Sequence, residues 1–161
     1  MIRLNLGCGA FPLKDFVNVD ILEKYGDVHC DVTNIPYEDN SVGEIYAGHI
    51  VEHLTFRDSL RAIEEWHRVL KPKGKLTITF PDYFKILKLY LDGTSGTSAL
   101  SDRLFGEWTS PDISEHHKQP VITPNLIRNL KKIGFRDVQE IDDSAYLTAK
   151  VDWQSIVECV K

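Results

Sequence analysis

The sequence predicts an α/β fold built on one doubly wound, mostly parallel sheet with helices on both faces. Short runs rich in Val, Ile and Leu alternate along the chain with helical patterns, which is the rhythm of βαβ units. The first run stops abruptly at Gly7-Cys8-Gly9, as a first strand does when its turn passes close to a ligand. The chain has 161 residues, 42% of them hydrophobic and 27% charged, so we expect a single domain over residues 1–161.

Charge and cysteine content narrow the functional class. A net charge of −5 at pH 7 argues against a broad nucleic-acid-binding face and makes nucleic acid a less favoured partner. The cysteines, Cys8, Cys30 and Cys159, are odd in number and lack C-x-x-C spacing, which favours reduced thiols over a disulfide frame or a zinc site. No apolar run approaches the ~20 residues of a membrane span, and no signal peptide precedes the first strand. We therefore expect a cytoplasmic protein that does not enter a membrane.

The alternation of apolar and polar residues predicts the first strands. They cover residues 3–6, 17–21, 28–30, 44–47 and 75–80. Only residues 10–16 connect the first two strands, whereas a parallel crossover usually takes about a dozen residues or more. Either the first helix is reduced to a turn or two, or these strands are not parallel. The βαβ rhythm of the later chain favours a short helix.

Polar residues mark where the first long helix starts and stops. Thr55 and Asp58 resemble a capping box, whose side chains satisfy the free N–H groups of a first helical turn. The turn formers of residues 71–74 stop this helix. A single helical turn is expected just before it, at residues 50–54.

The middle of the chain is harder to interpret. Residues 82–91 are strongly apolar and predict a helix that stops at Gly93. Residues 93–98 have the composition of a flexible loop, which is either a lid over the substrate or an ordinary surface loop. From there to Gln119 the pattern predicts no particular element.

The last helix and two strands are clearer. Thr123-Pro124 marks a helix start with proline in the first turn, and Gly134 is its expected stop. Two final strands are predicted at residues 136–141 and within residues 152–160. The buried face of the helix is expected to consist of Ile127, Leu130 and Ile133.

Small and acidic residues follow the predicted strands and should meet at one edge of the sheet. They are Gly7 and Gly9, Asp20, Asp31, Gly48 and His49, and Asp82. In open α/β sheets, ligands bind beyond the carboxyl ends of the strands. A carboxylate at Asp20 suits the two hydroxyls of a ribose, and one at Asp31 suits an exocyclic amine such as that of adenine. Singly, each carboxylate is also explained as a solvated strand end, but their order along the chain favours a nucleoside ligand.

The kind of nucleoside follows from what the glycine turn lacks. Pro12 stands where a dinucleotide fingerprint has its third glycine, and Asp20 follows the glycines too soon for that motif. The phosphate-binding motif G-x-x-x-x-G-K-[ST] is also absent from the sequence. A nucleoside without a phosphate chain, such as S-adenosylmethionine, fits these facts. A nicotinamide-dependent oxidoreductase is the weaker alternative.

Several motifs together resemble the class I S-adenosylmethionine-dependent methyltransferases, and more narrowly their small type 11-like members. The motifs are residues 4–9 (LNLGCG), 17–20 (VNVD), 31–37 (DVTNIPY), 52–54 (EHL), 70–76 (LKPKGKL) and 134–135 (GF). The resemblance spans nearly all of the chain up to Ile141. It implies a Rossmann-like sheet with an antiparallel C-terminal strand, and S-adenosylmethionine as cofactor.

The same resemblance implies a set of cofactor-binding positions. Backbone atoms of the glycine turn would run beside the methionine and ribose, Asp20 would hold the ribose diol, and Ile21 would lie against the adenine. Asp31 and Val32 would meet the adenine edge, while Gly48 and His49 would lie near the sulfonium. The complete set is Asn5, Gly7, Cys8, Gly9, Asp20, Ile21, Asp31, Val32, Gly48 and His49.

The chain departs from the family pattern in four ways. Asn5 replaces the usual acidic residue, and Gly43 stands where Asp is frequent. The first crossover is short, and no helix precedes the first strand. The last two departures leave the cofactor less covered, which favours weak binding or a covering partner subunit, for instance in a homodimer.

Methyl transfer requires in-line alignment of the acceptor, and a hydroxyl acceptor also benefits from a general base. The sequence does not single out a catalytic residue; the substrate-side candidates are His49, His53, Asp82, Tyr83, His116 and His117. His49 and His53 have the i, i+4 spacing of metal ligands, but no third ligand is evident nearby, so no metal site is expected.

The leading hypothesis is thus a methyltransferase with a small-molecule or saccharide-type acceptor. The alternative from another class is a non-catalytic or partner-dependent module that keeps the cofactor fold.

Overall fold

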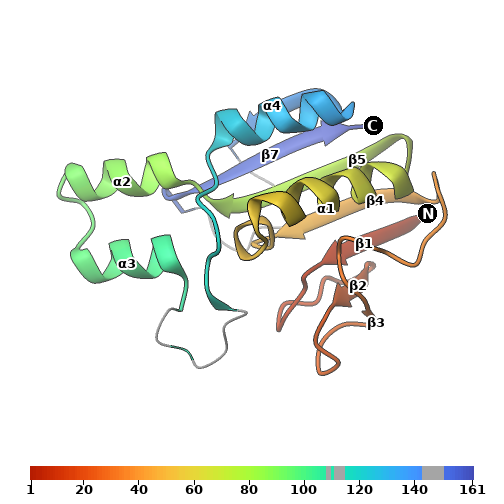
Figure 1. The fold of residues 1–161 in the computed structure, drawn as a ribbon, viewed down its shortest axis with the longest axis horizontal. Coiled ribbons are helices and arrows are strands. Elements are labelled where there is room, and N and C mark those ends of the chain that lie inside the picture. Colours follow the sequence, from red (N-terminus) through yellow and green to blue (C-terminus); the bar gives the residue numbers. More distant parts are fainter. Residues whose placement is uncertain (108–109, 111–114, 143–150) are drawn as a thin grey trace.

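The computed structural model describes residues 1–107, 110, 115–142 and 151–161, which form one seven-stranded sheet with helices (Figure 1). The strands are β1 (Ile2–Leu6), β2 (Val17–Asp20), β3 (Val28–His29), β4 (Val42–Gly48), β5 (Leu70–Pro81), β6 (Arg136–Ile141) and β7 (Gln154–Val160). The helices are the 3₁₀ turn η1 (Val51–His53) and the α-helices α1 (Phe56–Val69), α2 (Tyr83–Leu91), α3 (Thr97–Phe105) and α4 (Thr123–Ile133).

The sheet has the strand order β3-β2-β1-β4-β5-β7-β6. β1 to β5 pair in parallel, and β7 runs antiparallel to both of its neighbours, β5 and β6. The strand order reverses direction between β1 and β4, which is where open α/β sheets bind their ligands. The predicted Rossmann-like sheet, mostly parallel with an antiparallel C-terminal strand, is confirmed. The expected helices on both faces are not found among the described residues, because the connections between β1, β2 and β3 contain no helix.

The first crossover differs from the prediction. β1 and β2 are parallel, with Leu4 opposite Val17 and Leu6 opposite Val19. The expected short helix does not form, however: residues 7–16 contain only turns and irregular backbone. Side-chain hydrogen bonds replace it, because Asn18 Oδ1 accepts from the Leu13 N–H at 2.7 Å and from Asn5 Nδ2 at 2.9 Å.

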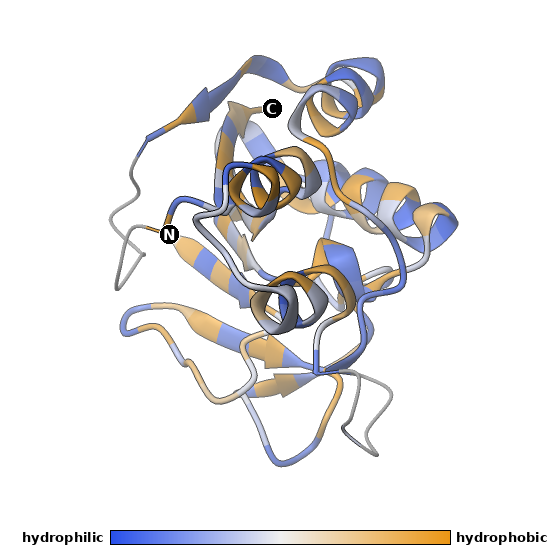
Figure 2. Cartoon of the chain, turned by 90° about the vertical axis from the view of Figure 1, so that its left-hand side faces the viewer, coloured by the Kyte–Doolittle hydropathy of each residue, from blue (hydrophilic) through white to orange (hydrophobic). Residues whose placement is uncertain are grey.

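The two long helices that pack on the sheet, α1 and α4, lie on the same side of it, and α2 and α3 extend past the carboxyl edge (Figures 1 and 2). Residues of α1 and α4 join the strands in one buried cluster, in which Trp66 of α1 and Leu130 of α4 are fully buried. The side chains facing them alternate along the strands. From the central strands they are Leu4, Leu6, Ile45, Ala47, Leu76, Ile78 and Phe80.

The opposite sheet face is polar. Arg3 on β1 forms an ion pair with Glu44 on β4, with 2.7 Å between Nε and Oε2. Lys75 and Glu158 form a similar pair across β5 and β7. This alternation fixes the register, since a shift by one residue would turn these charges into the core.

Helix boundaries largely follow the predicted caps. Thr55 Oγ1 accepts from the Asp58 N–H at the start of α1, which is one half of the predicted capping box. The Asp58 carboxylate accepts from the Thr55 hydroxyl, where a full capping box would have it accept from the Thr55 backbone N–H. α4 begins with Pro124 in its first turn and ends at Gly134, whose φ is 121°. Its buried apolar residues are Leu126 and Leu130, however, whereas the expected Ile127 and Ile133 are only partly buried and pack against the core from its margin.

β5 extends beyond its predicted bounds, and α3 is an element that the sequence did not predict. β5 starts at Leu70 and includes Pro81, because the turn at residues 71–74 pairs with the C-terminus: the Lys73 N–H donates to the Lys161 carbonyl, and the Lys161 N–H donates to the Gly74 carbonyl. α3 starts inside the predicted 93–98 loop. Among the described residues, no helix combines the length and apolar character needed to cross a membrane.

Candidate functional site

The glycine turn after β1 adopts backbone conformations that suit glycine. Gly7 has φ 65° and Gly9 has φ 48°, both in the left-handed region. A Cβ on Gly7 would lie 2.6 Å from Cδ1 of Ile50, so a larger residue here would require the Ile50 side chain to move. A Cβ on Gly9 would meet no atom within 4 Å. The turn therefore packs on the protein at Gly7 and faces open space at Gly9.

Asp20 ties the end of β2 to this turn. Its Oδ2 accepts from the Gly9 N–H at 2.8 Å, and its Oδ1 accepts from the Leu22 N–H at 2.9 Å. The Cys8 N–H donates to the Val19 carbonyl at 3.1 Å and extends the β1–β2 pairing into the turn. A carboxylate has about four acceptor positions, so each oxygen keeps capacity for a further donor such as a hydroxyl.

The three residues expected around an adenine differ in exposure: Ile21 and Asp31 are exposed, whereas Val32 is buried. Ile21 is 65% exposed at the sheet edge. Asp31 is also exposed, and its Oδ1 accepts from the backbone N–H and the hydroxyl of Thr33. Val32 contributes its side chain to the core, and its carbonyl accepts from the indole of Trp66 at 3.0 Å. Asp31 and Ile21 are therefore accessible from the carboxyl edge, whereas the Val32 side chain is not.

Asn5 and Cys8 have supporting positions. Asn5 Nδ2 donates to the Phe11 carbonyl at 3.2 Å, so this buried amide stabilises the chain that follows the glycine turn. Burial, reinforced by the negative charges of Asp20 and Asp27, raises the pKa of the Cys8 thiol to about 11. Cys8 is consequently a neutral thiol near pH 7 and not a nucleophile.

His49 stands at the end of β4 with φ 52°, and its N–H donates to the Thr79 carbonyl. Its Nδ1 lies 3.1 Å from Oε1 of Glu52, and its Nε2 lies 2.7 Å from Oε1 of Gln154. Burial opposes protonation, but Glu52 and Gln154 outweigh it and hold the pKa of His49 above its ordinary value. With an oxygen acceptor at each ring nitrogen, the imidazole is suited to the protonated form and has no free lone pair for a general base.

Asp82 serves the fold. As the N-cap of α2, its Oδ1 accepts from the N–H groups of Phe84 and Lys85, and its Oδ2 accepts from the N–H and hydroxyl of Thr123. Burial opposes ionisation, but these bonds outweigh it and lower the pKa of Asp82. The candidate role of Asp82 as a base is therefore not supported by its geometry.

The remaining substrate-side candidates separate into two groups. The Tyr83 hydroxyl donates to the Leu104 carbonyl and connects α2 to α3. His116 Nε2 lies 3.2 Å from the Ser110 carbonyl oxygen. His53 and His117, in contrast, are brought together edge to face, with 5.0 Å between ring centroids.

The sequence analysis missed Glu52 and Gln154, the partners of His49. Glu52 had a detectable signal, because it follows His49 at the i, i+3 spacing that puts two side chains on one side of a helical turn. Gln154 had none, since it reaches His49 from 105 residues away through the β5–β7 pairing.

Two cavities are lined by residues other than the glycine turn and Asp20. One of about 260 Å³ is lined by residues of α1, α4 and the segment before α4. The other, of about 130 Å³, lies at the start of β7 and includes Gln154 and Lys85. Neither is lined by any of the ten cofactor-binding candidates.

Several solved structures with this fold are described as methyltransferases. A methyltransferase from Archaeoglobus fulgidus, described as SAM-dependent, superimposes with a TM-score of 0.69 at 18% identity, covering 99% of this chain and 85% of that one. A SAM-dependent methyltransferase from Thermotoga maritima, described as a possible histamine N-methyltransferase, gives 0.68 at 18% identity over 99% and 82%. At these identities the likeness establishes the fold.

Sequence comparison finds methyltransferases over part of the chain. The profile of the family described as Methyltransferase domain (Methyltransf_11) matches residues 13–78, from before β2 into β5. Over these residues, about two fifths of the chain, the sequence is similar to that methyltransferase family. The demethylmenaquinone methyltransferase of Staphylococcus epidermidis is 36% identical over 75 residues, which cover 43% of this chain and 30% of that protein. This chain thus matches less than a third of the length of that methyltransferase.

The Archaeoglobus fulgidus and Thermotoga maritima proteins are described as SAM-dependent, and the residues at the corresponding edge of this sheet fit S-adenosylmethionine. The space in front of Gly9, where a Cβ would meet nothing, is open to a ligand that approaches the backbone. Asp20 beside it has acceptor capacity for ribose hydroxyls.

Proposed function

We propose that this protein transfers a methyl group from S-adenosylmethionine to a small-molecule or saccharide-type acceptor. The observation that carries the proposal is the connection of Asp20 to Gly9 at the carboxyl edge, next to the point where the strand order reverses. There the chain combines an open glycine turn with a carboxylate whose oxygens are already oriented. The pairing suits a ribose and offers no cradle for a phosphate chain.

The work of the chain in this reaction is binding and alignment. The sulfonium of the cofactor supplies an activated methyl group with a good leaving group. Asp20 would accept hydrogen bonds from the ribose hydroxyls, and the backbone from Gly7 to Gly9 would lie beside the methionine part. Positioning the acceptor in line with the methyl group can contribute several kcal/mol to the rate.

A small acceptor is supported by a named relative and by charge. The Staphylococcus epidermidis protein is named for methylation of demethylmenaquinone, a small molecule. The net charge of −5 is unfavourable for a nucleic-acid acceptor. We also propose a cytoplasmic location, which the free thiols of Cys8, Cys30 and Cys159 favour.

Calorimetric titration tests the cofactor assignment. Wild-type protein is titrated with S-adenosylmethionine, S-adenosylhomocysteine and NAD, and the titrations are repeated with Asp20→Ala. The control is Asp27→Ala, because Asp27 Oδ2 accepts from the Asn18 N–H at 2.8 Å and supports the same strand without facing Gly9. We expect Asp20→Ala to weaken binding of both sulfur nucleosides by about tenfold or more, a loss of roughly 1.4 kcal/mol, and Asp27→Ala to change it little. Equal affinity of wild type and Asp20→Ala would overturn the ribose assignment.

A non-catalytic or partner-dependent module is the second candidate. One observation favours it: residues 7–16 form no helix between β1 and β2, so this part of the chain places no helix over the glycine turn. Light scattering with and without S-adenosylhomocysteine tests whether a second subunit, as in a homodimer, covers the site. Transfer of labelled methyl groups to any acceptor in a cell extract, lost in Asp20→Ala, would exclude the non-catalytic module.

A further inference from the structure

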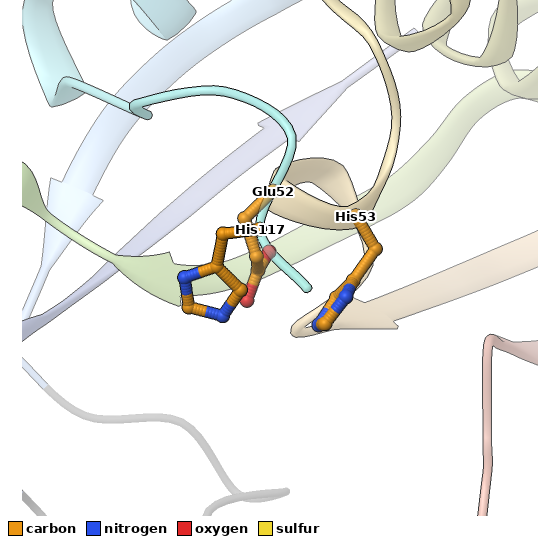
Figure 3. A group of neighbouring side chains, drawn as sticks. All are labelled: Glu52, His53 and His117. Carbon is orange, nitrogen blue, oxygen red and sulfur yellow. The ribbon is translucent and has the colours of Figure 1, made fainter. Parts of the chain in front are cut away.

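Three side chains with metal-binding chemistry converge just beyond the carboxyl end of β4 (Figure 3). Glu52 and His53 come from η1, and His117 comes from the segment before α4. One ligand atom of each lies within 4.8 Å of the other two. Two hydrogen bonds hold the segments together: the Lys118 N–H donates to the Glu52 carbonyl, and the Gln119 side-chain Nε2 donates to the Val51 carbonyl, both at 2.8 Å.

The cluster contains buried polar atoms that lack partners. Glu52 is 0% exposed, and while its Oε1 pairs with His49, its Oε2 has no hydrogen-bond partner among the described residues. In the same described part of the chain, Nδ1 of His53 and Nδ1 of His117 are also buried without a partner. A buried polar atom without a hydrogen-bond partner is unfavourable. Here each of the three side chains in the cluster has one such atom.

We propose that Glu52, His53 and His117 bind one divalent first-row transition ion, with Zn²⁺ as the best match. Two imidazoles and one carboxylate are the protein ligands of a class of zinc sites that keep a fourth position open. Mg²⁺ and Ca²⁺ prefer oxygen ligands, so the two imidazoles disfavour them. The carboxylate supplies negative charge against the ion, and a single ion would satisfy the unpaired atoms of the cluster together.

Neighbouring contacts are consistent with this ligand set. Glu52 is oriented by His49, which holds Oε1 and leaves Oε2 for the cluster. His117 lies 64 positions after His53 in the sequence, so the spacing of His49 and His53 alone could not reveal this ligand set.

The competing explanation is a shared proton or a water molecule within the cluster. A proton between Glu52 and one histidine would satisfy those two groups and leave the other imidazole unpaired. That arrangement by itself predicts no specific one-to-one Zn²⁺ binding that depends on all three side chains. Metal binding by the isolated chain therefore separates the two explanations.

The test uses the full chain after removal of metal with a chelator, without any cofactor present. Zn²⁺ and Mg²⁺ are titrated separately by calorimetry into wild type, Glu52→Gln, His53→Ala and His117→Ala. The matched control is His116→Ala, which removes the adjacent histidine, whose Nε2 lies against Ser110. We expect one Zn²⁺ per chain in wild type and in the control, no comparable affinity for Mg²⁺, and affinities reduced by about tenfold or more in the three variants.

Co²⁺ absorption provides a second measurement that does not depend on the stability of the variants. Wild-type protein should give the intense visible bands of a low-coordinate site, with one equivalent saturating them. Zn²⁺ should also raise the melting temperature of wild type and of His116→Ala, but not of His117→Ala. Absence of Zn²⁺ binding by wild type, wild-type affinity in both histidine variants, or a Co²⁺ spectrum indistinguishable from the aqueous ion would each overturn the proposal. Because no cofactor is used, these outcomes are independent of methyl transfer.

Discussion

The two glycines of the first turn should respond differently to the same substitution. Alanine in the left-handed region costs about 1–2 kcal/mol, of which roughly 0.4–1 kcal/mol is offset because alanine restricts the unfolded chain. Gly9→Ala adds a Cβ that meets no atom within 4 Å, so its net cost should be about 1 kcal/mol. Gly7→Ala places its Cβ 2.6 Å from Ile50 Cδ1, and overpacking of this kind adds about 1–3 kcal/mol. We therefore expect about 2–4 kcal/mol for Gly7→Ala.

The two substitutions should rank in the opposite order for cofactor affinity, with Gly9→Ala the more damaging. The Cβ of Gly9→Ala enters the space assigned to the cofactor, so this variant should stay folded and bind S-adenosylhomocysteine about tenfold more weakly or worse. Urea unfolding gives the stabilities and calorimetry the affinities. In an Ile50→Ala background, Gly7→Ala should lose its overpacking contribution, which a double-mutant cycle measures. Equal destabilisation by the two glycine variants, or unchanged affinity in Gly9→Ala, would refute the reasoning.

Three further predictions concern buried polar groups. Burial alone would lower the pKa of His49, and Glu52 supplies the main opposing charge. Glu52→Gln should therefore lower the pKa of His49, which an NMR titration measures. In the wild type, the charged imidazole should stabilise the fold fully below the ordinary pKa of histidine, and this stabilisation should be lost as pH rises through the raised pKa. Asp82→Ala should destabilise the protein by about 2–4 kcal/mol at pH 7 and by less in acid. The reason is that the pKa of Asp82 is lowered in the folded protein, so the stabilisation by its carboxylate is lost as pH falls through that pKa. Urea unfolding at several pH values measures the effect, and a destabilisation independent of pH would contradict the prediction. Trp66→Phe should cost about 1–3 kcal/mol in thermal or urea unfolding, because it leaves the buried Val32 carbonyl without its donor; wild-type stability would count against that bond.

The sequence could predict which residues meet at the carboxyl edge of the sheet, because that arrangement depends on local signals. Alternating apolar residues identify the strands, and residues that follow parallel strands meet at one edge. For this reason the glycine turn and Asp20 are adjacent in the structure, as expected. β6 matches its predicted bounds, and α1 and α4 start at the residues that the caps indicated.

Elements without a local signal were missed. α3 has no buried residue among its nine, so it shows no apolar stripe, and its glycine- and serine-rich approach resembles a loop. The expected short helix after β1 is replaced by side-chain hydrogen bonds around Asn18, which the helical pattern of the later chain could not indicate.

Long-range contacts account for the rest of the candidate site. Gln154 reaches His49, and His117 reaches Glu52, only through the pairing of distant segments. Asp82 carries the right residue type for a base, but its oxygens are occupied by the cap of α2 and by Thr123. Residue type and order thus predicted the position of the site, whereas the partners of each group required the structure.

The most direct test of the cofactor site is a crystal structure of the protein with S-adenosylhomocysteine. We expect the ribose hydroxyls within hydrogen-bond distance of Asp20, the nucleoside beside Gly9, and the sulfur facing the end of β4 near His49. A nucleoside bound elsewhere on the chain, or at this edge with no contact to Asp20, would contradict the proposed function.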